Sequence, residues 1–115
     1  MNLQVIRDPR GCLTVAEHFP FDVKRVYFLH HITGPRGGHA HRTLDRLLIA
    51  VAGSFTAILN GVPTRLYSPN EALRVPPMTW LELLDFSPDA VCLVLASSEY
   101  DAADYIRSYE EFLRR

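Results

Sequence analysis

The sequence predicts one all-β domain over residues 1–115, with a short helix near its C-terminal end. Short β-like runs dominate the chain, and Gly, Pro, Asn and Asp separate them at brief intervals, a pattern typical of a β-sandwich or barrel. Hydrophobic residues make up 48% of the chain, which is enough to pack one core in a domain of common size. No linker or internal repeat divides it, so a single domain is expected.

The expected strands are runs of β-branched and aromatic residues bounded by turn residues. They cover residues 13–16, 23–31, 43–52, 54–59, 62–66, 73–75, 81–85 and 90–96. Asn60-Gly61 lies between two such runs and is a strong signal for a tight hairpin turn. Asp-Pro-Arg-Gly at residues 8–11 marks another turn.

Only the C-terminal segment has the apolar spacing of a helix. Apolar residues recur there at intervals of three and four, which places them on one helical face. These residues are Tyr105, Ile106, Tyr109, Phe112 and Leu113. The spacing predicts one helix over residues 102–113.

Composition excludes several classes of partner. The formal charge of −1 provides no basic surface for nucleic acid or for an anionic membrane. The N-terminus lacks the form of a signal peptide and no apolar stretch could cross a bilayer, so we expect a cytoplasmic protein. Cys12 and Cys92 fit no C-x-x-C pattern, and Cys92 lies in an apolar run where a buried structural thiol is expected.

Two histidines, His39 and His41, follow a glycine-rich turn and precede an apolar run. In an extended strand, residues i and i+2 point to the same face, so the two imidazoles should lie side by side. If this strand were regular, that face would continue through Asp45 to Leu47, and Arg46 would point to the opposite face. A β-bulge would reverse this assignment.

Three interpretations of the histidine pair remain open from the residues alone. The histidines could be ordinary surface residues. They could bind zinc or iron with Asp45 as a carboxylate ligand, although no later histidine exists to complete a three-histidine set. They could instead transfer protons near neutral pH, with Tyr27, Arg36 and Arg46 as candidate partners or oxyanion donors.

Short motifs along the whole chain resemble those of a known family. They are Asp8-x-Arg10-Gly11-x-Leu13, Pro20-Phe21-x-x-Lys24-Arg25-Val26-Tyr27, Arg36-Gly37-x-His39-Ala40-His41-Arg42, Pro76-Pro77-Met78-Thr79-Trp80-x-Glu82, Asp85-Phe86-Ser87 and Tyr100-Asp101-x-Ala103-Asp104-Tyr105-Ile106-Arg107. In this order they resemble the sugar 3,4-ketoisomerases, also described as WxcM-like, of the cupin superfamily.

The resemblance implies a cupin-type β-barrel or jelly roll, and a homodimer that often exchanges an N-terminal strand. It implies a ketoisomerase that moves the carbonyl of dTDP-4-keto-6-deoxyglucose from C4 to C3 without a metal or other cofactor. The motif histidines of the family fall on His39 and His41, its upstream tyrosine on Tyr27 and its motif arginine on Arg36. By this resemblance His39, His41 and Tyr27 are catalytic. Arg36 and Arg46 are expected to bind the diphosphate, because arginine matches phosphate geometry.

Two positions depart from the resemblance. Many relatives have Trp-His-Glu where this chain has Trp80-Leu81-Glu82, and Arg46 replaces a neutral amide. Leu81 cannot ionise or bind a metal. It favours the alternative of a non-catalytic dTDP-sugar binding module. A metal-dependent cupin is a third alternative, against which the shortage of metal ligands argues.

Overall fold

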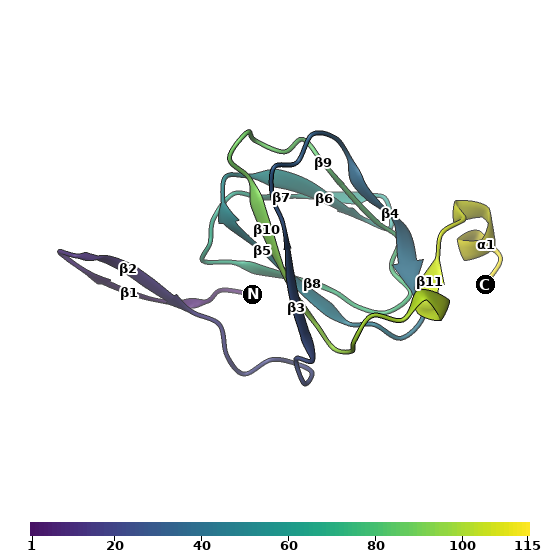
Figure 1. Cartoon of the computed structure of the whole chain (residues 1–115), viewed down its shortest axis with the longest axis horizontal. Helices are drawn as coiled ribbons and strands as arrows, with labels where there is room; N and C mark the ends of the chain where they lie inside the picture. Colours follow the sequence, from purple (N-terminus) through teal and green to yellow (C-terminus); the bar gives the residue numbers. More distant parts are fainter.

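Two antiparallel β-sheets form the body of the molecule, and a separate hairpin extends from it (Figure 1). The computed structural model describes all 115 residues. One sheet has the strand order β3-β10-β5-β8 and the other β11-β4-β9-β6-β7, while β1 pairs only with β2. The strands are β1 (Gln4–Asp8), β2 (Gly11–Val15), β3 (Arg25–Leu29), β4 (Arg36–His41), β5 (Arg46–Ala52), β6 (Phe55–Leu59), β7 (Val62–Leu66), β8 (Ala72–Val75), β9 (Leu81–Leu84), β10 (Val91–Ala96) and β11 (Tyr105–Ile106). The all-β prediction is confirmed.

The main core lies between the two large sheets. Its ten buried residues come from both of them: Leu48, Ala50, Phe55, Ala57, Leu66, Val75, Leu81, Leu83, Cys92 and Val94. Cys92 is fully buried, and burial raises the pKa of its thiol to about 12, as expected for a structural cysteine. The free thiol of Cys12 is exposed.

A second apolar layer covers the outer face of β5 and β10. Leu47, Ile49 and Leu95 are buried there beneath Phe19 and Phe21. The expectation that Leu47 shares the face of His39 is therefore wrong. Residues 42–45 leave the strand conformation between β4 and β5, so the alternation of faces starts again at Arg46, which points inward with Leu48. The expected strand over residues 43–52 accordingly begins at Arg46.

The C-terminal segment differs from the single helix expected over residues 102–113. It forms a 3₁₀ turn (Ala102–Asp104), then β11, then the short helix α1 (Tyr109–Leu113). Backbone pairing of β11 with β4 interrupts the helix, because Tyr105 lies opposite His41 and Ile106 opposite Ala40. The short helix itself is confirmed, beginning after the cap residue Ser108.

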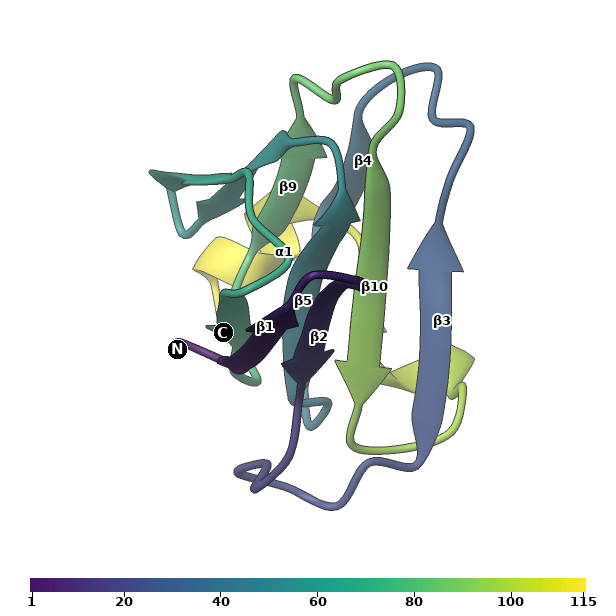
Figure 2. The same ribbon diagram turned by 90° about the vertical axis from the view of Figure 1, so that its left-hand side faces the viewer.

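The predicted turns are present, and β1 and β11 lie outside the expected strands, while β4 was expected only as an extended segment through the histidine pair. Asn60 and Gly61 both have positive φ, of 49° and 83°, as a type I′ hairpin turn requires. The turn at residues 8–11 joins β2 to β1, a strand that the sequence pattern did not reveal. Figure 2 shows this hairpin in front of the sheet that contains β5 and β10. No helix in the structure is long and apolar enough to cross a lipid bilayer.

Candidate functional site

The histidine pair lies on β4, and a β-bulge sets its orientation. The pairing of β4 with β9 shifts between Gly37 and His39. Gly37 has a φ of +88°, and a Cβ at this position would lie 2.7 Å from the carbonyl oxygen of Leu81. Glycine is therefore required for β4 to approach β9 this closely. After the bulge, His39 and His41 face one side of β4, and Ala40 packs on the other side against Trp80.

The two imidazoles are in contact, as the sequence predicts. Their ring centroids lie 5.1 Å apart with an interplanar angle of 87°. The ring of Tyr105, from β11, lies 5.0 Å from His39 and 4.2 Å from His41. His41 is buried behind His39, with 3% of its surface exposed.

A cavity of about 300 Å³ opens between the two sheets, at the lower end of the size range of small-molecule sites. Four of the five site residues predicted from sequence line it: Tyr27, Arg36, His39 and Arg46. His41 does not line the cavity, but its ring contacts that of His39, which does. Leu81 forms part of an apolar wall together with Leu48, Leu83 and Val94.

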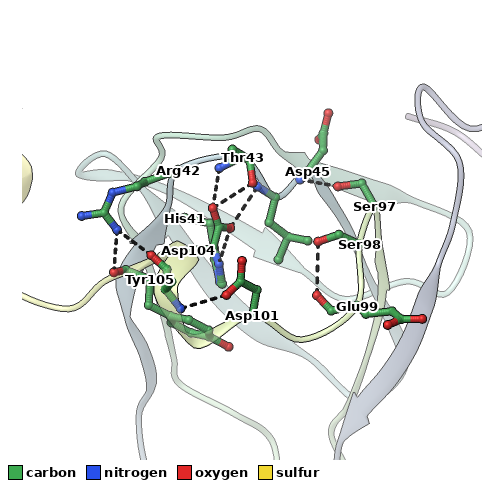
Figure 3. A network of polar contacts seen from close by, with 12 residues as sticks. His41, Arg42, Thr43, Asp45, Ser97, Ser98, Glu99, Asp101, Asp104 and Tyr105 are labelled. Carbon is green, nitrogen blue, oxygen red and sulfur yellow. Dashed lines mark hydrogen bonds and ion pairs between the residues drawn. The ribbon is translucent and has the colours of Figure 1, made fainter.

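A buried carboxylate holds His41 in place (Figure 3). His41 Nδ1 lies 3.2 Å from Asp104 Oδ2. The backbone N–H and the hydroxyl of Thr43 both donate to Asp104 Oδ1 at 2.8 Å, and the N–H of Leu44 donates to Oδ2 at 3.2 Å. Four hydrogen bonds thus fix this carboxylate. If His41 donates from Nδ1, its Nε2 is free to accept a proton.

Sequence reasoning missed the role of Asp104. It lies in a segment expected to be helical, where an acidic residue would normally be solvated. The one signal for it was its place in the Tyr100-to-Arg107 motif. Three further neighbours of the cavity were also missed, and the first of them, Tyr105, lines it. Arg25 lies over the ring of Tyr27 with its guanidinium carbon 5.0 Å from the ring centroid, and Arg107 lies over Tyr105 at 4.0 Å.

Both imidazoles are held in the neutral form. Burial, then the positive charge of Arg46, lowers the pKa of His39 to about 4. The same two causes lower the pKa of His41 to about 4, against the opposing effect of Asp104. For Asp104, burial raises the pKa, but hydrogen bonds led by those from Thr43 outweigh burial and leave it below its usual value. At neutral pH the site therefore combines two neutral imidazoles with a carboxylate.

The arginines of the site lie at different depths. Arg36 is exposed at the mouth of the cavity, whereas Arg46 is only 2% exposed and lies beside His39 and Tyr27. The pair expected to bind one diphosphate is thus divided between the rim and the interior. Arg36 alone has the accessibility that a diphosphate at the entrance needs.

Asp45 does not complete a metal site with the histidines. Its carboxylate accepts a hydrogen bond from Arg74 Nε at 3.0 Å, on β8. The set of two histidines and Asp45, which the residues alone left open, is not assembled in the structure, where Asp45 forms an ion pair with Arg74. No group of three or more His, Cys, Asp or Glu side chains in the structure could hold a metal ion.

Comparison with known proteins identifies the family of this site. Residues 1–115, the whole chain, match the protein family described as FdtA, WxcM-like C-terminal. The chain belongs to the FdtA/WxcM-like family. The resemblance read from the ordered motifs is thereby confirmed.

Characterised relatives of the FdtA/WxcM-like family are similar over nearly their full length. A TDP-4-oxo-6-deoxy-alpha-D-glucose-3,4-oxoisomerase of Aneurinibacillus thermoaerophilus is 42% identical, with 97% of this chain and 87% of the relative covered. The solved structure of WlaRB, a TDP-quinovose 3,4-ketoisomerase of Campylobacter jejuni, is 44% identical with a TM-score of 0.93, covering 99% of this chain and 95% of that one. QdtA, a sugar 3,4-ketoisomerase of Thermoanaerobacterium thermosaccharolyticum solved in complex with TDP, is 36% identical with a TM-score of 0.94, covering 98% and 89%. The expected cupin-type fold is confirmed.

Proposed function

We propose that this FdtA/WxcM-like protein is a sugar-nucleotide 3,4-ketoisomerase that converts dTDP-4-keto-6-deoxyglucose to a dTDP-3-keto-6-deoxyhexose. The observation that carries the proposal is the cavity that brings His39 and Tyr27 together, with His41 and its carboxylate behind them. Two neutral imidazoles and a phenol are proton carriers suited to chemistry next to a ketone. The relatives named above catalyse 3,4-isomerisation, which supports the same reaction here.

The reaction needs two proton movements and no net oxidation. A base removes the proton from C3, and the electrons of the broken C3–H bond form a double bond between C3 and C4. The C4 carbonyl oxygen takes the negative charge or a proton, which gives an enediolate or an enediol. A proton then returns to C4 while the C3 hydroxyl loses its proton and becomes the new carbonyl. His39 lines the cavity, so we assign to it the removal of the proton from C3 and the return of a proton to C4. Tyr27, which also lines the cavity, then relays the hydroxyl proton between the two oxygens, and His41 exchanges protons with the site through its ring contact with His39.

The entrance of the cavity suits the diphosphate of the substrate. Arg36 is exposed at the rim, and Arg25 lines the same cavity. Guanidinium groups form paired hydrogen bonds with phosphate oxygens, so these residues would anchor the nucleotide while the sugar reaches His39. Arg36 is thus proposed as a substrate-binding residue.

The deciding experiment is incubation with dTDP-4-keto-6-deoxyglucose in deuterated buffer. NMR should show solvent deuterium at C3 of the remaining substrate and a new 3-keto product that has deuterium at C4. Tight dTDP binding with neither signal would refute the enzyme and support the alternative of a dTDP-sugar binding module. That alternative is favoured by one observation: Leu81 puts an apolar wall where a proton-carrying side chain would have faced the cavity.

We also propose that the chain functions as a homodimer. The hairpin β1–β2 extends away from the body (Figure 1), and its Ile6 and Leu13 are 48% and 59% exposed. Val26 and Phe28 on the edge strand β3 are each 57% exposed. Apolar surface of this extent on the hairpin and on an edge strand is typical of an interface, and a second copy would cover both regions.

Sedimentation velocity tests this proposal. Leu13→Glu should convert a dimer into a monomer, because it would place a charge in the buried contact. Val62→Glu is the matched control, since Val62 is 64% exposed on β7 in the body, away from the hairpin and β3. A monomeric wild type, or a Leu13→Glu variant that remains dimeric, would refute the proposed interface.

The low pKa values of His39 and His41 predict that activity is retained to an unusually acidic pH. A base must be neutral to accept a proton, and the pKa of His39 and of His41 is about 4. The value of kcat/KM should therefore stay level as pH falls from 7 to about 5.5 and decline only as pH approaches 4. An ordinary histidine would give a decline near its reference pKa of about 6.5. A pH profile with circular dichroism at each pH distinguishes titration from unfolding.

A further inference from the structure

Arg46 is a buried cation without a carboxylate partner. It is the first residue of β5, lines the cavity, and is 2% exposed. It takes part in no ion pair, and its Nε has no hydrogen-bond partner. The groups that favour its charged form are the phenols of Tyr27 and Tyr105, while burial lowers its pKa.

An unpaired charge in this environment is costly. Burying a charge without an opposite charge costs several kcal/mol, and arginine does not escape this cost by losing its proton, because its pKa stays too high. Nearby Arg25 adds a like charge, which makes the position less favourable still. A buried, unpaired guanidinium that lines a cavity is therefore arranged to meet an anion that enters or forms there.

We propose that Arg46 stabilises the enediolate oxygen that forms when the C3 proton is removed, rather than the diphosphate of the substrate. The inference rests on the proposed function. In that step the C3–H bond breaks, the proton goes to His39, and the electrons shift through the new C3–C4 double bond onto the C4 oxygen. The negative charge then lies on an oxygen in the cavity shared by Arg46, His39 and Tyr27. The charge disappears again when C4 is protonated and the C3 carbonyl forms.

The depth of Arg46 separates this role from nucleotide binding. The diphosphate must remain joined to a nucleoside outside the sugar pocket, and Arg36 already occupies the exposed rim. The uncharged ring of the keto sugar has no anion for Arg46 until the reaction starts. An interaction made only in the transition state raises kcat with little effect on binding.

The charge of Arg46 also affects the pKa of His39, the proposed base, and of His41 behind it. It is the second cause, after burial, of the low pKa of both His39 and His41. Besides Arg46, Arg107 acts on His39, and His39 and Asp104 act on His41. Removing the charge of Arg46 should therefore raise the pKa of both histidines, whereas removing a diphosphate anchor at the rim should not.

The test compares Arg46→Met with Arg36→Gln in the full-length protein, using dTDP-4-keto-6-deoxyglucose for turnover and dTDP for binding. Methionine removes both the charge and the hydrogen-bond donors, whereas glutamine would restore the neutral amide of relatives. For Arg46→Met we expect kcat to fall by about 10²–10³, as for loss of an oxyanion donor. The dissociation constant of dTDP should change by less than about threefold, and the acid limit of kcat/KM should move to higher pH. Arg36→Gln should show the reverse, with weaker dTDP binding and an unmoved acid limit.

Each other outcome overturns the assignment. Weaker dTDP binding with kcat retained in Arg46→Met would make Arg46 a nucleotide anchor, and unchanged kcat would remove it from the reaction. If Arg46→Met does not fold, Arg46→Lys tests the same point, since it keeps the charge and loses the fork. Its kcat should fall less than about tenfold with dTDP binding kept, and weakened dTDP binding at full kcat would refute the proposal. A wild type without isomerase activity refutes the proposed function instead.

Discussion

Replacement of His39 by asparagine should abolish isomerisation while leaving the nucleotide bound. Asparagine keeps a polar side chain of similar size but cannot accept a proton at neutral pH. Loss of a general base typically costs about 10²–10⁴ in rate. Because His39 lines the cavity, deuterium exchange at C3 should disappear together with the product. NMR of the sugar signals measures both, and calorimetry with dTDP measures the retained binding.

Replacement of His41 separates the two imidazoles. His41 lies behind His39 and outside the cavity lining, so His41→Asn should slow product formation more than it slows the exchange at C3. If His41→Asn eliminates the exchange and His39→Asn does not, the two roles must be interchanged. His18→Asn provides the matched control, because the His18 side chain is 91% exposed and outside the cavity lining. Wild-type turnover in both site variants would remove the pair from the reaction.

The sequence was sufficient to predict the local features of the site. The alternation of residues in a strand placed His39 and His41 side by side, which needs only the two-residue period of β structure. The turn at Asn60-Gly61 followed from the tolerance of both residues for positive φ. Tyr27, Arg36 and Arg46 were identified as site residues, and they line one cavity with His39.

Long-range features could not be predicted in the same way. The faces of β5 were misassigned because residues 42–45 interrupt the strand, and the period carries no information across such a break. Asp104 was missed because its partners, Thr43 and Leu44, lie about sixty residues earlier in the chain. The helical spacing in the C-terminal segment was real, but backbone pairing of Tyr105 and Ile106 with β4 prevailed over it.

Replacement of Asp104 by asparagine should have the largest effect on stability, and it should also slow the reaction. The carboxylate accepts four hydrogen bonds in a buried position, from the Thr43 N–H and hydroxyl, the Leu44 N–H and the His41 ring. An amide presents one oxygen and one NH₂ group, so at least one of these buried donors would face another donor. A hydrogen bond to a charged group is worth about 1.5–3 kcal/mol, and an unsatisfied buried donor costs about 1–3 kcal/mol. We expect a loss of about 3 kcal/mol in the free energy of unfolding, measured by urea denaturation.

If Asp104 had only a structural role, its replacement would lower stability without changing kcat. The measurement of kcat therefore decides whether Asp104 acts in the reaction. Both the hydrogen bond and the charge of Asp104 raise the pKa of His41, which makes this imidazole a better proton acceptor and favours the Nδ1–H form. Asp104→Asn should therefore reduce kcat by about 10–100-fold, the range for loss of an orienting partner, with KM nearly unchanged. Nitrogen-15 NMR of the imidazoles should show His41 losing its fixed tautomer. Asp101→Asn is the matched control, since the exposed Asp101 caps only the 3₁₀ turn. A less stable Asp104→Asn variant with normal kcat and an unchanged His41 tautomer would show that Asp104 has a structural role only. The carboxylate would then hold the 42–45 segment without acting on the proton of His41.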